Sequence, residues 1–267
     1  MKKEYILVGI LIVVYALYKK SKSTSTSPSM NTPSPSSSSS SSSSSVNELP
    51  YEKVKNIIYV NEIMKNKWNI TSRAARIGIL CTIAKESGFL PRWETGYSKT
   101  SNARIRKVFP TKTKGLTDEQ LNDLKSTDEK WFSFIYGGIL GNRPNTNDGY
   151  TFRGNGLNGL TGRANFEKYA KLSGIDILNN PSLNNQIKEA TQIMLHFFYN
   201  GWDSAKGKAK LKAKGYNYVN DITDIDWAIR YFCSINAGNR DMDNKWTNFA
   251  YDQAIKFKPV MEKIILN

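Results

Sequence analysis

The chain has 267 residues, and its 38 Lys and Arg against 23 Asp and Glu give a net charge of +15 at pH 7. This excess of positive charge favours a polyanionic partner, such as nucleic acid, an anionic membrane or an anionic cell-wall polymer, and does not define a fold. With 2 Cys and 1 His in the whole chain, a Cys/His zinc cluster or a zincin-like site is excluded, and we expect neither a catalytic metal nor another cofactor.

The chain begins with a short apolar segment between basic flanks. The 14 residues from Tyr5 to Tyr18 carry no charge, which is fewer than the roughly 20 apolar residues of a membrane-spanning helix. Lys19 and Lys20 follow where a cleaved signal peptide would require small residues, while flanking Lys side chains and Tyr rings suit a membrane interface. We therefore predict a membrane anchor over residues 1–22, with a signal peptide or a buried helix as the alternatives.

Residues 23–47 are rich in Ser, Thr and Pro and contain an unbroken Ser tract from Ser36 to Ser45. Such a segment has almost no apolar surface to bury, so nothing offsets the entropy cost of ordering it. We predict a flexible linker here. The remaining residues 48–267 then form a globular domain of 220 residues, and because the first 47 residues hold 5 Lys and 1 Glu, this domain carries +11.

Residues 48–267 show helical periodicity almost throughout, and no run of alternating apolar and polar residues is long enough to indicate a substantial sheet. We therefore predict a mainly α-helical domain. Several of the predicted helices begin at Ser, Thr, Asp or Asn, the residues that cap helix starts. The predicted helices are Leu49 to Trp68, Ser72 to Ser87, Thr117 to Leu124, Asp128 to Tyr136, Arg163 to Leu172, Leu183 to Asn200, Ile222 to Ser234 and Lys245 to Ile265.

A Gly-rich segment interrupts this helical pattern. Residues 137–162 hold 8 Gly, which indicates an irregular backbone that closely approaches another group. Long irregular loops in a compact domain are usually functional or disordered. The apolar residues Phe152, Leu157 and Leu160 favour an ordered loop.

Three further features have ordinary structural interpretations. His196 lies among apolar residues on a predicted helix, so we expect a packed histidine. Cys81 and Cys233 fall on predicted core helices, and we expect buried thiols there, with a disulfide as the alternative because sequence does not give their separation. A run of alternate Lys residues is typical of a solvated face and comprises Lys206, Lys208, Lys210, Lys212 and Lys214.

Glu86 has an unusual place in the predicted helix over residues 72–87. Ile79, Ile83 and Glu86 fall on one helix face, so the carboxyl continues a stripe that otherwise contacts apolar neighbours. The same carboxyl lies in the last helical turn, where the helix dipole disfavours negative charge. Burial and the dipole both favour the protonated form, which a general acid requires near neutral pH. A surface Glu at the helix end is the alternative.

A second acid, Glu94, follows Pro91, which forces the chain out of the helix. Eight residues extend to about 28 Å at most. A turn can therefore bring the carboxyls of Glu86 and Glu94 to the separations found in glycosidases, roughly 6.5–9.5 Å in inverting enzymes and about 5 Å in retaining ones. Trp93 and Tyr97 flank Glu94; aromatic rings beside paired acids suit sugar rings, and core packing is the alternative role for them.

Several short motifs follow one another in the order seen in a known family. They are AKESGF (84–89), ETGYS (94–98), NARIRKVF (102–109), YGG (136–138), DGYTFRGNG (148–156), LTGRANF (160–166) and GIDILNNP (174–181). Together they resemble the glycoside hydrolase family 19, or chitinase-like, domain, especially that of phage endolysins and virion lysozymes, over roughly residues 72–238. The resemblance implies a lysozyme-like, two-lobed helical fold with a central cleft, and inverting hydrolysis of β-1,4 links between N-acetylated sugars.

The resemblance also implies roles for individual residues. Glu86 matches the general acid that protonates the departing glycosidic oxygen, and Glu94 matches the general base that activates water on the opposite face of the sugar ring. Thr161 matches the Ser or Thr that helps to hold this water. The remaining matches bind substrate or line the cleft, and they are Tyr97, Arg153, Asn165 and Asn236. Structural alternatives are that Arg153 braces the Gly-rich loop and that the two Asn cap helices.

Two motifs depart from the family pattern. The family's RGRG loop reads RGNG at residues 153–156, and its QLT reads GLT at residues 159–161. One guanidinium and one amide that help to build the family's cleft are thus absent, while both acids are retained. This combination suggests altered specificity more than lost activity.

We therefore predict a membrane-anchored enzyme of a phage virion membrane or the host cell envelope that degrades peptidoglycan or a chitin-like glycan. A lytic transglycosylase is one alternative, because its catalytic motif resembles Glu86-Ser-Gly-Phe and it needs Glu86 alone. A catalytically inactive, wall-binding virion protein is another. Only the Lys run favours a nucleic-acid-binding function. Because base-stacking motifs of the common RNA folds are not apparent, we expect no nucleic-acid partner.

Overall fold

The computed structural model describes residues 49–265. The anchor predicted over residues 1–22 and the linker predicted over residues 23–47 lie outside this part of the chain. Within residues 49–265, no helix combines the length and the hydropathy that a membrane crossing requires.

The described part of the chain is mainly α-helical, as the sequence predicts, and contains no β-strand. Its only sheet-like pairing is an isolated antiparallel bridge between Asn155 and Leu160. In chain order the elements are α2 (Tyr51–Asn66), α3 (Arg73–Ser87), α4 (Asn102–Val108), α5 (Asp118–Leu124), α6 (Asp128–Tyr136), α7 (Asp148–Thr151), α8 (Arg163–Ser173), η1 (Pro181–Asn185), α9 (Ile187–Trp202), α10 (Ala205–Ala213), η2 (Val219–Asp221), α11 (Ile225–Asn236), α12 (Lys245–Ala254), η3 (Ile255–Phe257) and α13 (Lys258–Ile264).

Most of the predicted helices are present, and two of them are divided. The helix predicted over residues 245–265 is split into α12, η3 and α13, because Pro259 cannot continue a helix interior and instead occupies the first turn of α13. The helix predicted over residues 183–200 is η1 followed by α9, separated by the extended residue Gln186 (ψ 130°). The short helices α4, α7 and α10 were not predicted, because their few turns carry little apolar periodicity.

The larger group of helices is built around α3. Its residues from Ala74 to Ala84 are all buried, as expected for a helix that is surrounded on every side. It packs most extensively against α11, and Gly78 permits this close approach, since a Cβ at that position would lie 2.8 Å from the Cβ of Ala228. Residues of α2, α9, α12 and α13 complete this main hydrophobic core.

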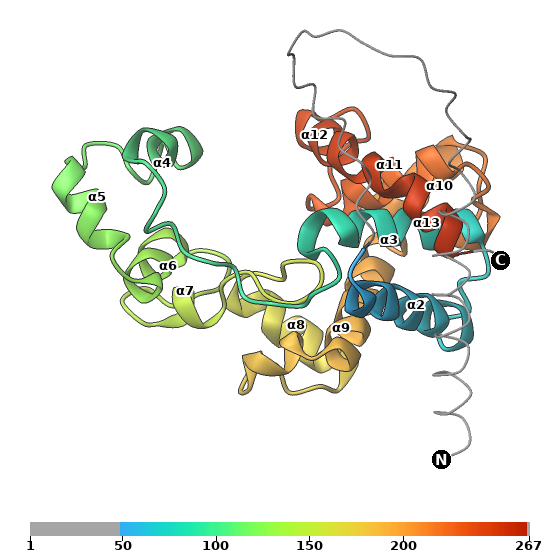
Figure 1. Ribbon diagram of the computed structural model, residues 1–267, viewed down its shortest axis with the longest axis horizontal. Coiled ribbons are helices and arrows are strands. Elements are labelled where there is room, and N and C mark those ends of the chain that lie inside the picture. Colours follow the sequence, from blue (N-terminus) through green and yellow to red (C-terminus); the bar gives the residue numbers. More distant parts are fainter. Residues whose placement is uncertain (1–48, 266–267) are drawn as a thin grey trace, which may run out of the picture.

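A smaller group of helices has its own core. Trp131 and Phe132 of α6 are fully buried there, together with Ile105 of α4 and Leu121 of α5. Figure 1 shows this group, in green, standing apart from the red and teal helices of the larger group, with the segment after α3 crossing between them. The loop between α7 and α8 forms a third cluster with α8 and α9, through residues such as Phe152.

The Gly-rich segment ends in an ordered loop, as its apolar residues indicated. Phe152, Leu157 and Leu160 are buried, and the backbones of Asn155 and Leu160 exchange hydrogen bonds of 3.1 and 2.8 Å. Gly156 has a φ of 83°, and a Cβ there would lie 2.4 Å from the Asn184 side chain. The loop therefore has a defined shape and is packed against η1.

The predicted structural residues behave largely as expected. Cys81 and Cys233 are buried free thiols, and His196 packs edge-on against Trp68 with ring centroids 4.7 Å apart. The Lys run lies mostly on exposed positions of α10 and its end. Lys210 differs from the others, because its ammonium is partly buried and donates hydrogen bonds to groups of the loop after α11.

Candidate active site

Glu86 lies in the last turn of α3, whose end is shaped by local backbone geometry. Gly88 ends the helix in the left-handed conformation, with φ 58°, and Phe89 follows with φ 66°. Such a φ is unfavourable for a bulky residue, but the Phe89 side chain is buried and its carbonyl accepts a hydrogen bond from Asn56 Nδ2 at 2.9 Å. The chain thus turns sharply after α3 and leaves Glu86 at the helix end.

The Glu86 carboxyl is held through one oxygen. Its Oε1 accepts hydrogen bonds from Lys85 Nζ at 2.7 Å and from Asn236 Nδ2 at 2.8 Å, while Oε2 has no hydrogen-bond donor among residues 49–265. The side chain is 23% exposed, which agrees with the half-buried position that periodicity indicated. The Lys85 ammonium pairs with this carboxyl, a contact that the sequence did not predict.

Glu94 lies on the segment that crosses between the two groups of helices. Its backbone N–H donates to the carbonyl of Gly154 at 2.6 Å, and its own carbonyl accepts from Arg153 Nε at 3.3 Å. The crossing segment is thereby attached to the loop between α7 and α8. This attachment fixes the position of Glu94 relative to that loop.

The Glu94 carboxyl is partly buried and accepts two hydrogen bonds. Its Oε2 accepts from Tyr136 Oη at 3.0 Å and from the backbone N–H of Gly154 at 3.3 Å. Burial nevertheless raises the pKa of Glu94, against the lowering effects of Tyr136, the Gly154 N–H, Arg153 and Tyr97. Burial and the nearby Glu94 carboxyl also raise the pKa of Tyr136 and of Tyr97, so both phenols remain hydrogen-bond donors.

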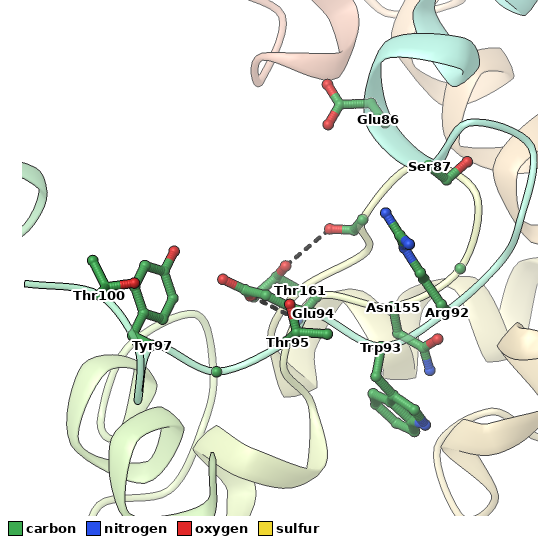
Figure 2. A pocket seen from close by; sticks show the side chains of 14 residues that line it. Glu86, Ser87, Arg92, Trp93, Glu94, Thr95, Tyr97, Thr100, Asn155 and Thr161 are labelled. Atoms are coloured by element: carbon green, nitrogen blue, oxygen red, sulfur yellow. Dashed lines mark hydrogen bonds between the residues drawn. The ribbon is translucent and has the colours of Figure 1, made fainter. Parts of the chain in front are cut away.

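One cleft of about 520 Å³ contains both acids. Figure 2 shows Glu86 on one side of it and Glu94, with Tyr97 and Thr161, on the other. Gly154 lies between the Glu94 carboxyl and the Thr161 hydroxyl, because a Cβ there would be 3.0 Å from Glu94 Oε2 and 3.4 Å from Thr161 Oγ1. Four of the residues assigned by resemblance therefore meet in a single cleft.

The other three residues assigned by resemblance lie outside the lining of this cleft. The Arg153 guanidinium is sandwiched between the rings of Trp93, at 4.3 Å, and Tyr150, at 4.1 Å, so it braces the Gly-rich loop. Asn165 Nδ2 donates to the carbonyl of Thr161 at 2.7 Å and so helps to hold the loop in place. Asn236 lies in an adjoining hollow and reaches the cleft only through its bond to Glu86.

Sequence reasoning missed Lys85, Tyr136 and Gly154 as parts of this site. Lys85 precedes Glu86 and pairs with it, and Tyr136 reaches Glu94 from the end of α6. Tyr136 and Gly154 were noted only as members of family-like motifs, and no local pattern signals that they bind Glu94. The partnership depends on how α6 and the loop pack in three dimensions.

The arrangement suits acid and base chemistry by the two carboxyls. Within residues 49–265, no group of three or more His, Cys, Asp or Glu side chains is placed to bind a metal ion. The two carboxyls of the cleft have different surroundings. Glu86 lies beside the Lys85 ammonium, and Glu94 is partly buried beside the phenols of Tyr136 and Tyr97. Such a difference is what separates a proton donor from a proton acceptor in one site.

Comparisons with known proteins leave the family of the chain undetermined. A scan against protein-family models and a search of curated proteins both found no match.

Proposed function

We propose that the chain is a glycoside hydrolase that cleaves β-1,4 bonds between the N-acetylated sugars of peptidoglycan, with Glu86 and Glu94 as its acid and base. The observation that carries this proposal is the meeting of two carboxyls, from different elements, in one open cleft. Paired carboxyls on either side of a scissile bond are the usual machinery of glycoside hydrolysis. The motif resemblance to the chitinase-like family supports a lysozyme-like helical fold and an inverting reaction.

Glu94 is proposed as the general base. The Thr161 hydroxyl lies close by across Gly154, so a water bound there could contact both the hydroxyl and the carboxyl. Burial raises the pKa of Glu94, and a carboxylate whose pKa is raised towards neutrality accepts a proton more readily.

Glu86 is proposed as the general acid. Asn236 and Lys85 hold Oε1, which leaves Oε2 as the oxygen that can donate to the glycosidic oxygen.

The cleft also carries positive charge that suits peptidoglycan. Arg92 lines it, and Lys85 lies beside Glu86. Peptidoglycan bears carboxylates on its stem peptides, whereas chitin is uncharged. Basic side chains beside the bound sugars therefore favour peptidoglycan over chitin as the substrate.

The test is mass spectrometry of fragments released from purified peptidoglycan by the full chain. We expect products with free reducing ends, and a loss of at least about a hundredfold in rate for Glu86→Gln and for Glu94→Gln, since each removes an acid or base. Glu167→Gln, an exposed Glu on α8, is the matched control and should retain full activity.

Three results would overturn the proposal. Undiminished cleavage by Glu94→Gln with 1,6-anhydro products would indicate a lytic transglycosylase that uses Glu86 alone. Absence of any released fragment, together with sedimentation of the intact chain on cell walls, would indicate a wall-binding protein without turnover. Full activity of Glu86→Gln would exclude the proposed site altogether.

A further inference from the structure

A second hollow adjoins the cleft on the far side of Glu86. It has a volume of about 370 Å³ and shares Glu86 and Gly159 with the cleft as wall residues. Residues at the end of α11 and on α12 form its other walls, and α12 packs beside α3 in the larger group of helices (Figure 1).

Two exposed aromatic side chains line this hollow. Trp246 and Phe249 of α12 are 54% and 59% exposed, the highest values among the large hydrophobic residues that the structure describes. They stand three residues apart on a helix, and such residues share a face. Exposed aromatic rings gathered at a concave site are costly to leave in water and are typical of a binding surface.

Two amide side chains of the hollow have buried polar atoms without hydrogen-bond partners. Asn158 is 6% exposed, and neither its Oδ1 nor its Nδ2 is hydrogen-bonded to any residue in the described range 49–265. Asn236 donates to Glu86 through Nδ2, while its Oδ1 lacks a partner there. An unpaired buried amide is unfavourable, so a ligand that brings donors and acceptors to these atoms as it enters the hollow would offset this cost.

We propose that this hollow binds a further N-acetylated sugar unit of the same glycan that occupies the cleft. Trp246 and Phe249 pack against the apolar face of the sugar ring, and the Asn158 amide bonds to its hydroxyl or acetamido group. The proposal rests on the proposed function for the identity of the glycan. The aromatic rings and the amides suit a ligand with one apolar face and many hydroxyls, and the charges of the lining residues Lys85 and Glu86 are paired with each other. The shared wall at Glu86 places this sugar next to the chain in the cleft.

The test is binding of the N-acetylglucosamine hexamer by the full chain carrying Glu94→Gln, which blocks turnover without altering the hollow. Adding Trp246→Ala and Phe249→Ala should weaken hexamer binding, measured by titration calorimetry, by about tenfold or more. The matched control is Tyr218→Ala, which removes an exposed aromatic ring that lines neither the cleft nor the hollow. It should leave the affinity unchanged.

A second variant separates binding from stability. Asn158→Leu removes a buried amide that has no protein partner, so the melting temperature should stay the same or rise, while hexamer binding falls. The indole N–H signal of Trp246, assigned with Trp246→Phe, should shift during the hexamer titration.

The outcomes distinguish this inference from the proposed function. Unchanged hexamer affinity in the Trp246 and Phe249 variant, in a chain that hydrolyses peptidoglycan, would overturn the inference and leave the function intact. Loss of hexamer binding in that variant, in a chain that hydrolyses nothing, would support the glycan site and overturn the function. A shift of the Trp246 signal by an isolated stem peptide and not by the hexamer would also overturn the inference.

Discussion

Replacing Tyr136 with Phe tests the electrostatic arrangement around Glu94. The phenol Oη donates to Glu94 Oε2 at 3.0 Å, and this bond opposes the rise in the pKa of Glu94 that burial causes. Phenylalanine keeps the ring that stacks on Phe132 with centroids 5.9 Å apart and removes only the donor. Tyr136→Phe should therefore raise the pKa of Glu94 further.

The size of the shift follows from the strength of the lost bond. A hydrogen bond to a charged group contributes about 1.5–3 kcal/mol, which corresponds to about 1–2 pKa units. Tyr136 is partly exposed, and the carboxyl keeps the Gly154 N–H and Tyr97 as donors. We therefore expect the lower end of this range, an increase of about 1 pKa unit.

The assay is a pH titration of the ¹³C carboxyl signal of Glu94, assigned with Glu94→Gln. Tyr169→Phe removes the hydroxyl of another buried tyrosine, at which burial alone raises the pKa, and should leave the signal unchanged. If Glu94 is the general base, the acidic limb of the pH–activity profile moves to higher pH by the same amount. An unchanged or lower pKa in Tyr136→Phe would refute the electrostatic reasoning, and a shift of the alkaline limb instead would show that Glu94 is the proton donor.

Three further changes test stability. Burial raises the pKa of Glu94 above its ordinary 4.5. The contribution of this carboxyl to stability is therefore present below pH 4.5 and is lost as pH rises through the pKa of the folded state. Glu94→Gln should raise the free energy of unfolding in urea near neutral pH, and this gain should vanish in acid. Gly78→Ala should destabilise the fold by about 2 kcal/mol in the same assay, since a Cβ would lie 2.8 Å from backbone and side-chain carbon of Ala228, and a neutral effect would contradict the close packing of α3 on α11. Arg143 lowers the pKa of Asp148 from 3.8 to about 2. Asp148→Asn should therefore lower the free energy of unfolding by on the order of 1 kcal/mol at neutral pH, because solvent screens the exposed Arg143. The difference in stability between the two proteins should disappear as pH falls from about 4 to about 2.

The helical fold could be predicted because its signals are local. Apolar periodicity is enough to place α3, and with it Glu86, near the correct residues. The division of the last predicted helix at Pro259 shows where a single breaker outweighs a long apolar pattern. Helix α4 buries a single residue, Ile105, and shows no apolar pattern, whereas α5 is equally short but begins at the capping residue Thr117.

The site could be predicted only in part, because its contacts join distant segments. The two acids were identified from motifs, but their surroundings were not. The ammonium beside Glu86 belongs to the adjacent residue, and a helical-wheel argument places Lys85 on a different face, although its long side chain reaches back to the carboxyl. The phenol of Tyr136 meets Glu94 across 42 positions of sequence, a proximity that depends on how α6 packs.

The two acids depend on separately packed cores. Glu86 is carried by α3 at the centre of the main core, whereas the donors to Glu94 come from α6 and from the loop beside it. Different parts of a protein unfold locally with different free energies. The smaller core can therefore unfold first and remove the hydrogen-bond donors to Glu94 while α3 stays folded. The acid pair then persists only while both cores are folded, so the packing around Trp131 helps to keep the pair together although it belongs to a different core from Glu86.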